Sequence, residues 1–195
     1  GVPLDEALSI AAHLVDGACD RASEGDLEHA ISLMDELIRS PDSSRCAPEL
    51  HYFCANAWSG LRLLRHSTDD ARSNWRQPEL QNENLCLRRA RHANGFGSLP
   101  TGRRAQILTN TGNLLSTVGR CLEAVDLYDE ALSVLPNFGM ALGNRGVALK
   151  ELAVHHYDRH QSALILHRGH RDLSAAPKEH FSPGAEVAFR RHADE

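Results

Sequence analysis

The sequence of 195 residues lacks several features that would assign it to a broad class of protein. No stretch approaches 18 consecutive apolar residues, so we expect no membrane-spanning helix and no membrane partner. The N-terminus has neither the basic end nor the apolar centre of a signal peptide, which predicts a cytoplasmic protein. Twenty-one basic residues stand against 26 acidic ones, and the resulting net charge of −5 argues against nucleic acid as a partner of this chain.

The usual signs of a catalytic or cofactor site are also missing. The five cysteines are widely spaced, odd in number and without a CxxC pair, which argues against a disulfide framework and a zinc ribbon. There is no Gly-rich phosphate loop and no GxSxG nucleophile elbow. We therefore expect no catalytic residue, no cofactor and no enzymatic activity in this chain.

What the sequence does contain is a series of helices. Apolar residues recur at helical spacing, and no β-branched run bounded by turn residues predicts a strand. The breaks between the helical stretches are rich in turn formers, and their short lengths predict antiparallel hairpins stacked on one another. We expect an all-α fold of about eight helices, at Pro3 to Ala22, Asp26 to Arg39, Glu49 to His66, Pro78 to Ala93, Gly102 to Val118, Arg120 to Leu135, Phe138 to Tyr157 and His160 to Ala175.

Large and small residues follow a distinct pattern over two of these helices. The positions that carry it are Leu108, Gly112 and Leu115 in the first helix, and Ala124, Tyr128 and Ala131 in the second. Gly112 and Ala131 would let the two helices approach closely, while the larger side chains fill the space between them. Pro136 can end the second helix because it cannot continue it.

The same pattern returns further along the chain. Thirty-four residues on, Leu142, Gly146 and Leu149 repeat the order of Leu108, Gly112 and Leu115. This pattern and its period resemble the tetratricopeptide (TPR) repeat. The resemblance implies a solenoid of stacked helix hairpins whose inner helices line a concave groove.

Reading upstream in the same register gives two more degenerate units. We expect a helical repeat domain at residues 1–176, followed by a flexible C-terminal tail at 177–195. The four units lie near residues 11–44, 48–94, 105–137 and 139–175, the second enlarged and the fourth without the pattern in its second helix.

Four asparagines fall on positions of the inner helices that face the groove in TPR proteins, namely Asn56, Asn110, Asn113 and Asn144. A side-chain amide both donates and accepts hydrogen bonds, so it can bind the backbone of a peptide whatever its sequence. The resemblance therefore implies a protein interaction module that holds a peptide or helix of a partner protein. The alternative is that asparagine is simply frequent at these positions of TPRs.

A longer resemblance suggests a second function. The stretch NTGNLLSTVGRCLEAVDLYDEALSVLPNFGMALGNRGVALKELA, followed by YDRH, is similar to the repeat region of a bacterial family in which TPRs precede a HEPN ribonuclease domain. That family implies a sensor or regulatory role in phage defence or in a toxin system. Only Arg45 and His51 have the spacing of the HEPN catalytic pair, and Pro48 between them argues that the match is chance. The catalytic domain would then be missing from this chain.

Histidines are concentrated near the end of the chain, with seven of twelve in the last 41 residues. His156 and His160 are four residues apart, so they could share a helix face and bind a metal. This would suit a metal-dependent hydrolase, a third possible function. No HExxH motif and no cysteine or glutamate joins the pair, so we expect no metal and interpret these histidines as solvated or interface residues.

Overall fold

The computed structural model describes residues 4–40, 43, 46–66 and 76–168. Within these ranges the chain is all-helical and has no β-strand, which confirms the predicted fold class. A short 3-10 helix, Phe96–Ser98, precedes the fifth α-helix. The α-helices are α1 Leu4–Asp20, α2 Glu24–Arg39, α3 Ala47–Arg65, α4 Pro78–His92, α5 Thr101–Thr117, α6 Cys121–Val134 and α7 Gly139–Arg168.

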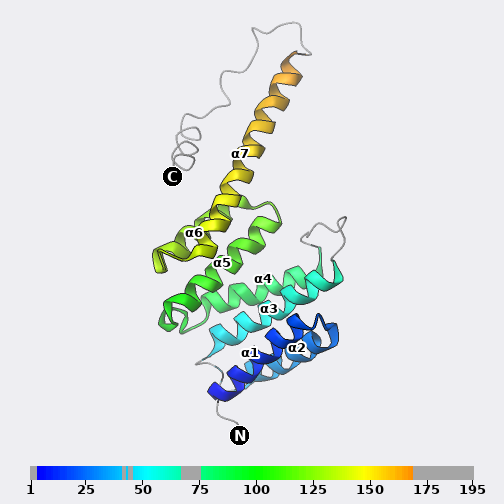
Figure 1. The fold of residues 1–195 in the computed structure, drawn as a ribbon, viewed down its shortest axis with the longest axis vertical. Coiled ribbons are helices and arrows are strands. Elements are labelled where there is room, and N and C mark those ends of the chain that lie inside the picture. The colour runs from blue at the N-terminus through cyan, green and yellow to red at the C-terminus, as the bar shows by residue number, and fades with distance from the viewer. Residues whose placement is uncertain (1–3, 41–42, 44–45, 67–75, 169–195) are drawn as a thin grey trace.

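Each helix packs on the next one in the chain, and α1 also contacts α3 while α5 also contacts α7. Figure 1 shows this order from α1 and α2 at one end to α7 at the other. Two apolar cores result, one built by α1 to α5 and one by α5 to α7. The fifth helix belongs to both, because Ile107 and Leu114 face the first core and Leu108 and Leu115 face the second. None of the described helices combines the length and apolar content needed to cross a lipid bilayer.

The hairpin of α5 and α6 depends on two glycines. A Cβ atom on Gly112 would lie 2.6 Å from Cε1 of Tyr128, so the aromatic ring occupies the space that a side chain would need. Gly119 then turns the chain with a φ of 82°, a conformation that L side chains rarely adopt. The Arg120 amide closes the end of α5 by donating to the Leu115 carbonyl at 2.9 Å.

The predicted helices Phe138 to Tyr157 and His160 to Ala175 are not separate. One continuous helix, α7, runs from Gly139 to Arg168, so the predicted break between these two helices is wrong, and the described residues hold seven α-helices. Ala153 stands thirty-four residues after Gly119, and alanine favours a helix where glycine allows a turn. No glycine or proline lies between Tyr157 and His160 either. Residues 169–175 and the predicted tail at 177–195 lie outside the described residues.

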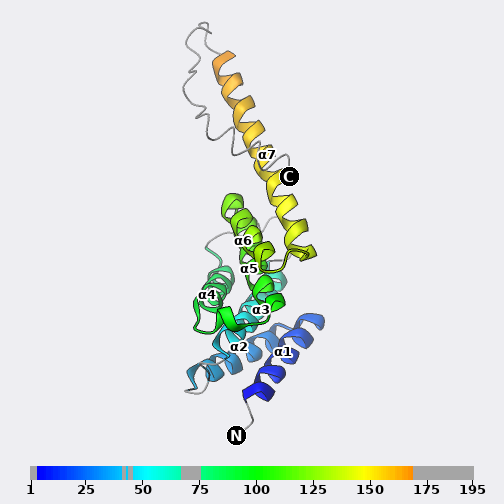
Figure 2. The same cartoon turned by 90° about the vertical axis from the view of Figure 1, so that its left-hand side faces the viewer.

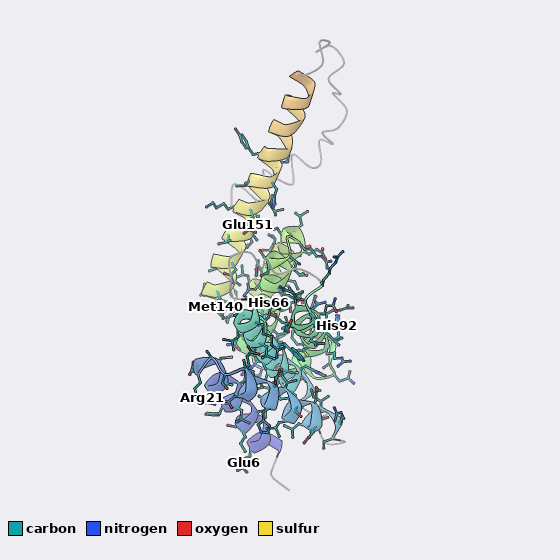
Figure 3. The ribbon with its side chains drawn as sticks, turned by 90° about the vertical axis from the view of Figure 1, so that its right-hand side faces the viewer. Glu6, Arg21, His66, His92, Met140 and Glu151 are labelled. Carbon is teal, nitrogen blue, oxygen red and sulfur yellow. The ribbon has the colours of Figure 1, made fainter. Side chains whose placement is uncertain are left out.

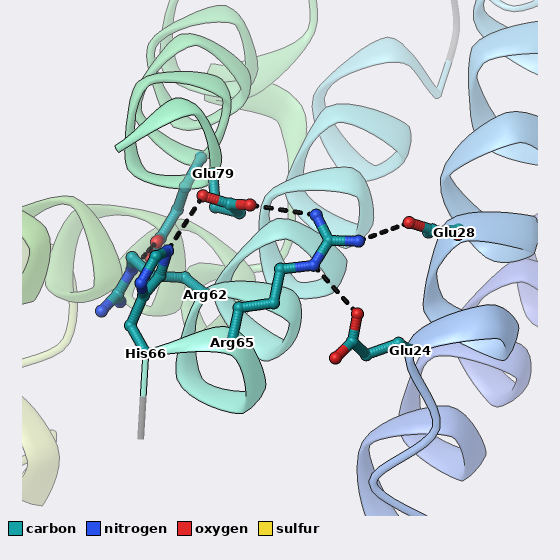
Figure 4. A network of polar contacts seen from close by, with 7 residues as sticks. Glu24, Glu28, Arg62, Arg65, His66 and Glu79 are labelled. Carbon is teal, nitrogen blue, oxygen red and sulfur yellow. Dashed lines mark hydrogen bonds and ion pairs between the residues drawn. The ribbon is translucent and has the colours of Figure 1, made fainter. Parts of the chain in front are cut away.

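A polar network joins α2, α3 and α4 on the surface of the first core (Figure 4). Arg65 of α3 donates to Glu24 and Glu79 at 3.0 Å each and also to Glu28. Glu79 is the buried member, and His66 contacts its second oxygen at 3.3 Å. Burial raises the pKa of Glu79, but the hydrogen bonds from Arg65, its own backbone and His66 outweigh this, so the net pKa is lowered. Arg65 of α3 thus connects α2 and α4 through its hydrogen bonds.

We expect the substitution Arg65→Met to lower the free energy of unfolding by about 1 kcal/mol at pH 7, because it leaves Glu79 buried with one partner fewer. The ionised Glu79 contributes to the free energy of unfolding above the carboxyl pKa of the unfolded chain, about 4.3. This contribution is lost as the pH falls through the lower pKa that Glu79 has in the folded chain. Urea unfolding at pH 7 and at pH 3.5 should therefore show a difference that becomes smaller in acid. Arg88→Met, at an exposed arginine of α4, is the matched control and should cost nothing measurable.

Candidate functional site

Two adjoining hollows run across α3, α5 and α7. The smaller has a volume of about 130 Å³ and lies among α3, α4 and α5. The larger, of about 370 Å³, lies among α5, α6 and α7. Asn113 and Thr117 line both, and we name the two hollows together the asparagine groove. Its other lining residues are Ala55, Asn56, Ser59, Arg62, Glu83, Leu87, Asn110 and Leu114 in the smaller hollow, and Ser116, Tyr128, Asn144, Val147 and Glu151 in the larger.

The structure brings all four predicted asparagines together in this groove. Asn56 lies on α3, Asn110 and Asn113 lie one turn apart on α5, and Asn144 lies on α7; all are half-buried. Asn110 Nδ2 donates to Asn56 Oδ1 at 3.4 Å, and Asn144 Nδ2 donates to Asn113 Oδ1 at 2.7 Å. The amides therefore link the three helices in two pairs.

Two tyrosines orient these amides. Asn110 Nδ2 also donates to the Tyr52 hydroxyl at 3.3 Å, and the Tyr128 hydroxyl donates to Asn113 Oδ1 at 2.9 Å. Burial, together with the charges of Cys121 and Glu151, raises the pKa of Tyr128 to about 12. The phenol therefore remains a neutral donor at ordinary pH, and Asn113 keeps one orientation.

The hydrogen bonds leave one group of each amide without a partner among the described residues. These groups are Nδ2 of Asn56, Oδ1 of Asn110, Nδ2 of Asn113 and Oδ1 of Asn144. Taken from α3 through α5 to α7, this row of groups alternates as donor, acceptor, donor and acceptor. Sequence reasoning found the four residues but not this alternation, because it depends on which amide bonds to which across the helices.

A buried ion pair lies at one end of the groove. Arg62 Nε donates to Glu83 Oε2 at 2.8 Å, and the two side chains are only 9% and 8% exposed. Burial raises the pKa of Glu83 by more than the bond from Arg62 lowers it. The sequence does carry a signal for Glu83, because Leu80, Glu83 and Leu87 share one face of α4 and both leucines are buried. Its partner on α3 has no such signal.

The other residues considered in the sequence contribute less. His156 is exposed on α7, and the side chain of His160 lies outside the described part, as does Arg45 of the HEPN-like pair. Across the described ranges, no three histidine, cysteine, aspartate or glutamate side chains are grouped to hold a metal ion. No protein-family model, no curated protein and no solved structure matches the chain.

Proposed function

We propose that this chain is a TPR-like solenoid that binds an extended peptide segment of a partner protein in the asparagine groove, without catalysis. The observation that carries the proposal is the alternating row of free amide groups on α3, α5 and α7. The backbone of an extended peptide also alternates carbonyl and N–H groups, so it can match such a row whatever its side chains.

The row favours an extended peptide over a helix. A helix satisfies its own backbone groups internally and exposes only those of its first and last turns. The four amides would then have no backbone to bind along most of a helix. An extended segment keeps these groups available, and its side chains can enter the wider hollow beside Val147 or the polar one beside Ser59.

The solenoid arrangement is supported by the way in which each helix packs on the next one in the chain. Helix α5 contributes side chains to both apolar cores. A helix shared in this way by neighbouring cores is typical of repeat proteins, in which each unit contacts only its neighbours. The helices that carry the asparagines, α3, α5 and α7, are alternate helices of the chain. Inner helices of a TPR array have this order.

The test begins with a random peptide library displayed on phage and selected on the purified protein, followed by titration of synthetic hits. In Asn113→Asp, the retained Oδ1 can still accept from Tyr128 and Asn144, while the free donor becomes an acceptor. We expect this change to weaken peptide binding at least tenfold, because a peptide carbonyl would then face an oxygen.

Thr117→Asp is the matched control for the added charge, since Thr117 lines the same groove outside the row of amides. It should retain most of the affinity. Methylating single backbone nitrogens of a hit should weaken binding at alternate residues only. Equal losses in the two aspartate variants, or no selected peptide, would rule out recognition by the amide row.

A further inference from the structure

The larger hollow of the asparagine groove continues along α7 beyond the row of amides. Asn144, Val147 and Glu151 line it in steps of three and four residues, so the three side chains share one face of α7. Figures 1 and 2 show that α7 begins beside α6 and continues past the other helices. Glu151, labelled in Figure 3, lies on the part that still contacts α5 and α6. The hollow therefore holds a carboxylate about 10 Å along the helix from Asn144.

The carboxylate of Glu151 has no cation beside it. It is the only charged group among the described residues that line the larger hollow, and none of the ion pairs in the described part of the chain includes it. Ser116 Oγ donates to its Oε2 at 3.5 Å, and Cys121 Sγ donates to the same oxygen at 3.3 Å. Both bonds are weak, because the first is long and a thiol is a poor donor. The half-buried side chain thus keeps Oε1 for a further partner.

The hydroxyl groups near this carboxylate also present acceptors rather than donors. The hydroxyls that line the larger hollow belong to Ser116, Thr117 and Tyr128. Ser116 donates to Glu151, as described above. Thr117 donates to the Asn113 carbonyl and Tyr128 donates to Asn113 Oδ1, both at 2.9 Å. A hydroxyl has one proton, so these groups can offer a ligand only their lone pairs.

The charge of Glu151 acts on the walls of the hollow. Burial raises the pKa of Cys121, and the hydrogen bond and charge of Glu151 raise it further. The raised pKa of Tyr128 also depends in part on Glu151. Both groups are therefore neutral at ordinary pH, and neither competes with a ligand as a second negative charge.

The smaller hollow has a different charge pattern. Its charged lining residues in the described chain are Arg62 and Glu83, which form an ion pair with each other. The two charges cancel, so a charged side chain of either sign gains little there. A cationic side chain is therefore favoured in the larger hollow.

We propose that the larger hollow binds a lysine or arginine side chain of the partner peptide, with the cationic group at Glu151 and the alkyl stem over Val147. This inference rests on the proposed function, because the peptide backbone on the amide row carries the side chain into the hollow. An ammonium or guanidinium group only donates hydrogen bonds, which matches the carboxylate and the lone pairs around it. Val147 is 55% exposed, and the stem of a basic side chain covers apolar surface of this kind while its charged end remains in a polar site.

The length of the hollow selects a long side chain. A backbone bound to the amide row lies beside Asn144, and Glu151 stands about 10 Å further along α7. Side chains of a helix lean toward its N-terminus, so the carboxylate leans back toward Asn144 and shortens this gap. A lysine or arginine can span the remainder, whereas a serine, asparagine or valine leaves the carboxylate without a partner.

Substitutions in the peptide test the subsite on the wild-type protein. Peptides selected from the phage library should share a lysine or arginine at one constant position. Methionine keeps an unbranched stem but has no charge, so placing it at this position should weaken binding about tenfold. Methionine at any other basic position of the same peptide should have little effect. Titration of synthetic peptides measures both changes.

Glu151→Gln tests the same contact from the protein side. Glutamine keeps the size of the side chain and one oxygen but removes the charge. We expect the basic peptide to bind this variant about tenfold more weakly, and the methionine peptide to bind it as tightly as it binds the wild type. Asp126→Asn, at an exposed carboxylate of α6 outside the groove, is the matched control and should keep the wild-type affinity. Selection on Glu151→Lys should yield peptides with aspartate or glutamate at the constant position.

The outcomes separate this inference from the proposed function. Dependence on Asn113 is measured as Asn113→Asp relative to Thr117→Asp, because both variants add one charge to the same hollow. Peptides that depend on Asn113 but bind Glu151→Gln as tightly as the wild type would overturn the basic subsite alone. Peptides that depend on Glu151 but not on Asn113 would support the subsite and refute recognition by the amide row. A library that yields no peptide would refute both.

Discussion

The substitution Gly112→Ala should lower the free energy of unfolding by about 2 kcal/mol, which corresponds to a melting temperature about 4–8 °C lower. The new methyl group would lie 2.6 Å from Cε1 of Tyr128 and 3.0 Å from two further ring atoms. The ring cannot turn aside easily, because it is buried and its hydroxyl is bonded to Asn113. The better helix propensity of alanine, about 1 kcal/mol, offsets only part of this strain.

Gly146→Ala is the matched control, since Gly146 holds the equivalent position of α7. There the methyl group would meet no described atom within 4 Å, so only the gain in helix propensity remains. We expect this variant to be more stable than the wild type by about 0.5–1 kcal/mol. Urea unfolding of both variants, followed by circular dichroism, checks the pair. Equal effects at the two glycines would mean that Tyr128 does not occupy the space over Gly112.

This pair of glycines shows where sequence reasoning stops. Helical periodicity and turn-forming residues were sufficient to predict that the described chain is all-helical, because both are local properties. The same pattern of large and small residues surrounds Gly112 and Gly146. What covers each glycine depends on the chain that follows, and α6 follows one while α7 simply continues after the other.

The wrongly predicted break in α7 has the same origin. A break after Tyr157 followed from extending the repeat, although Ala153 and the absence of glycine or proline between Tyr157 and His160 favour one long helix. The helix propensity of these residues therefore decided the structure of α7, and the 34-residue repeat did not. In the fourth unit, the missing repeat pattern of the second half was a better guide to the continuous helix than the period of the preceding units.

For the candidate site, the resemblance to TPR repeats identified the four asparagines, because it implies which positions of the inner helices face the groove. It could not show that Tyr52 and Tyr128 orient Asn110 and Asn113, since those bonds join different helices. The Arg62 and Glu83 pair was not predicted either. Its two members are 21 residues apart, and only the contact between α3 and α4 brings them together.

The substitution Arg62→Met should cost about 3 kcal/mol of unfolding free energy at pH 7.5, because it leaves the carboxylate of Glu83 buried without its charged partner. The cost is limited, since Glu83 can take up a proton instead of remaining charged. Protonation costs about 1.4 kcal/mol for each pH unit above the unfolded pKa of about 4.3. The penalty at pH 5.5 should therefore be below about 2 kcal/mol.

The sign follows from the pKa of Glu83, which burial already raises in the wild type and which the loss of Arg62 raises further. A group with a raised folded pKa contributes stability below its unfolded pKa and loses it as the pH rises through the folded value. Urea unfolding between pH 5 and pH 8 should thus show the variant falling further behind the wild type as the pH increases. A penalty that is constant over this range would show that Glu83 is already solvated.

The double variant Arg62→Met with Glu83→Leu separates the value of the ion pair from the cost of breaking it. Replacing both charges leaves no buried charge unpaired, and apolar pairs of similar volume are often as stable as the ion pair they replace. We expect the double variant to recover most of the stability lost in Arg62→Met and to lose the pH dependence. If instead it is as unstable as the single variant, the pair contributes stability in its own right. Recovery would indicate that these charges are retained for the polar end of the asparagine groove rather than for the fold.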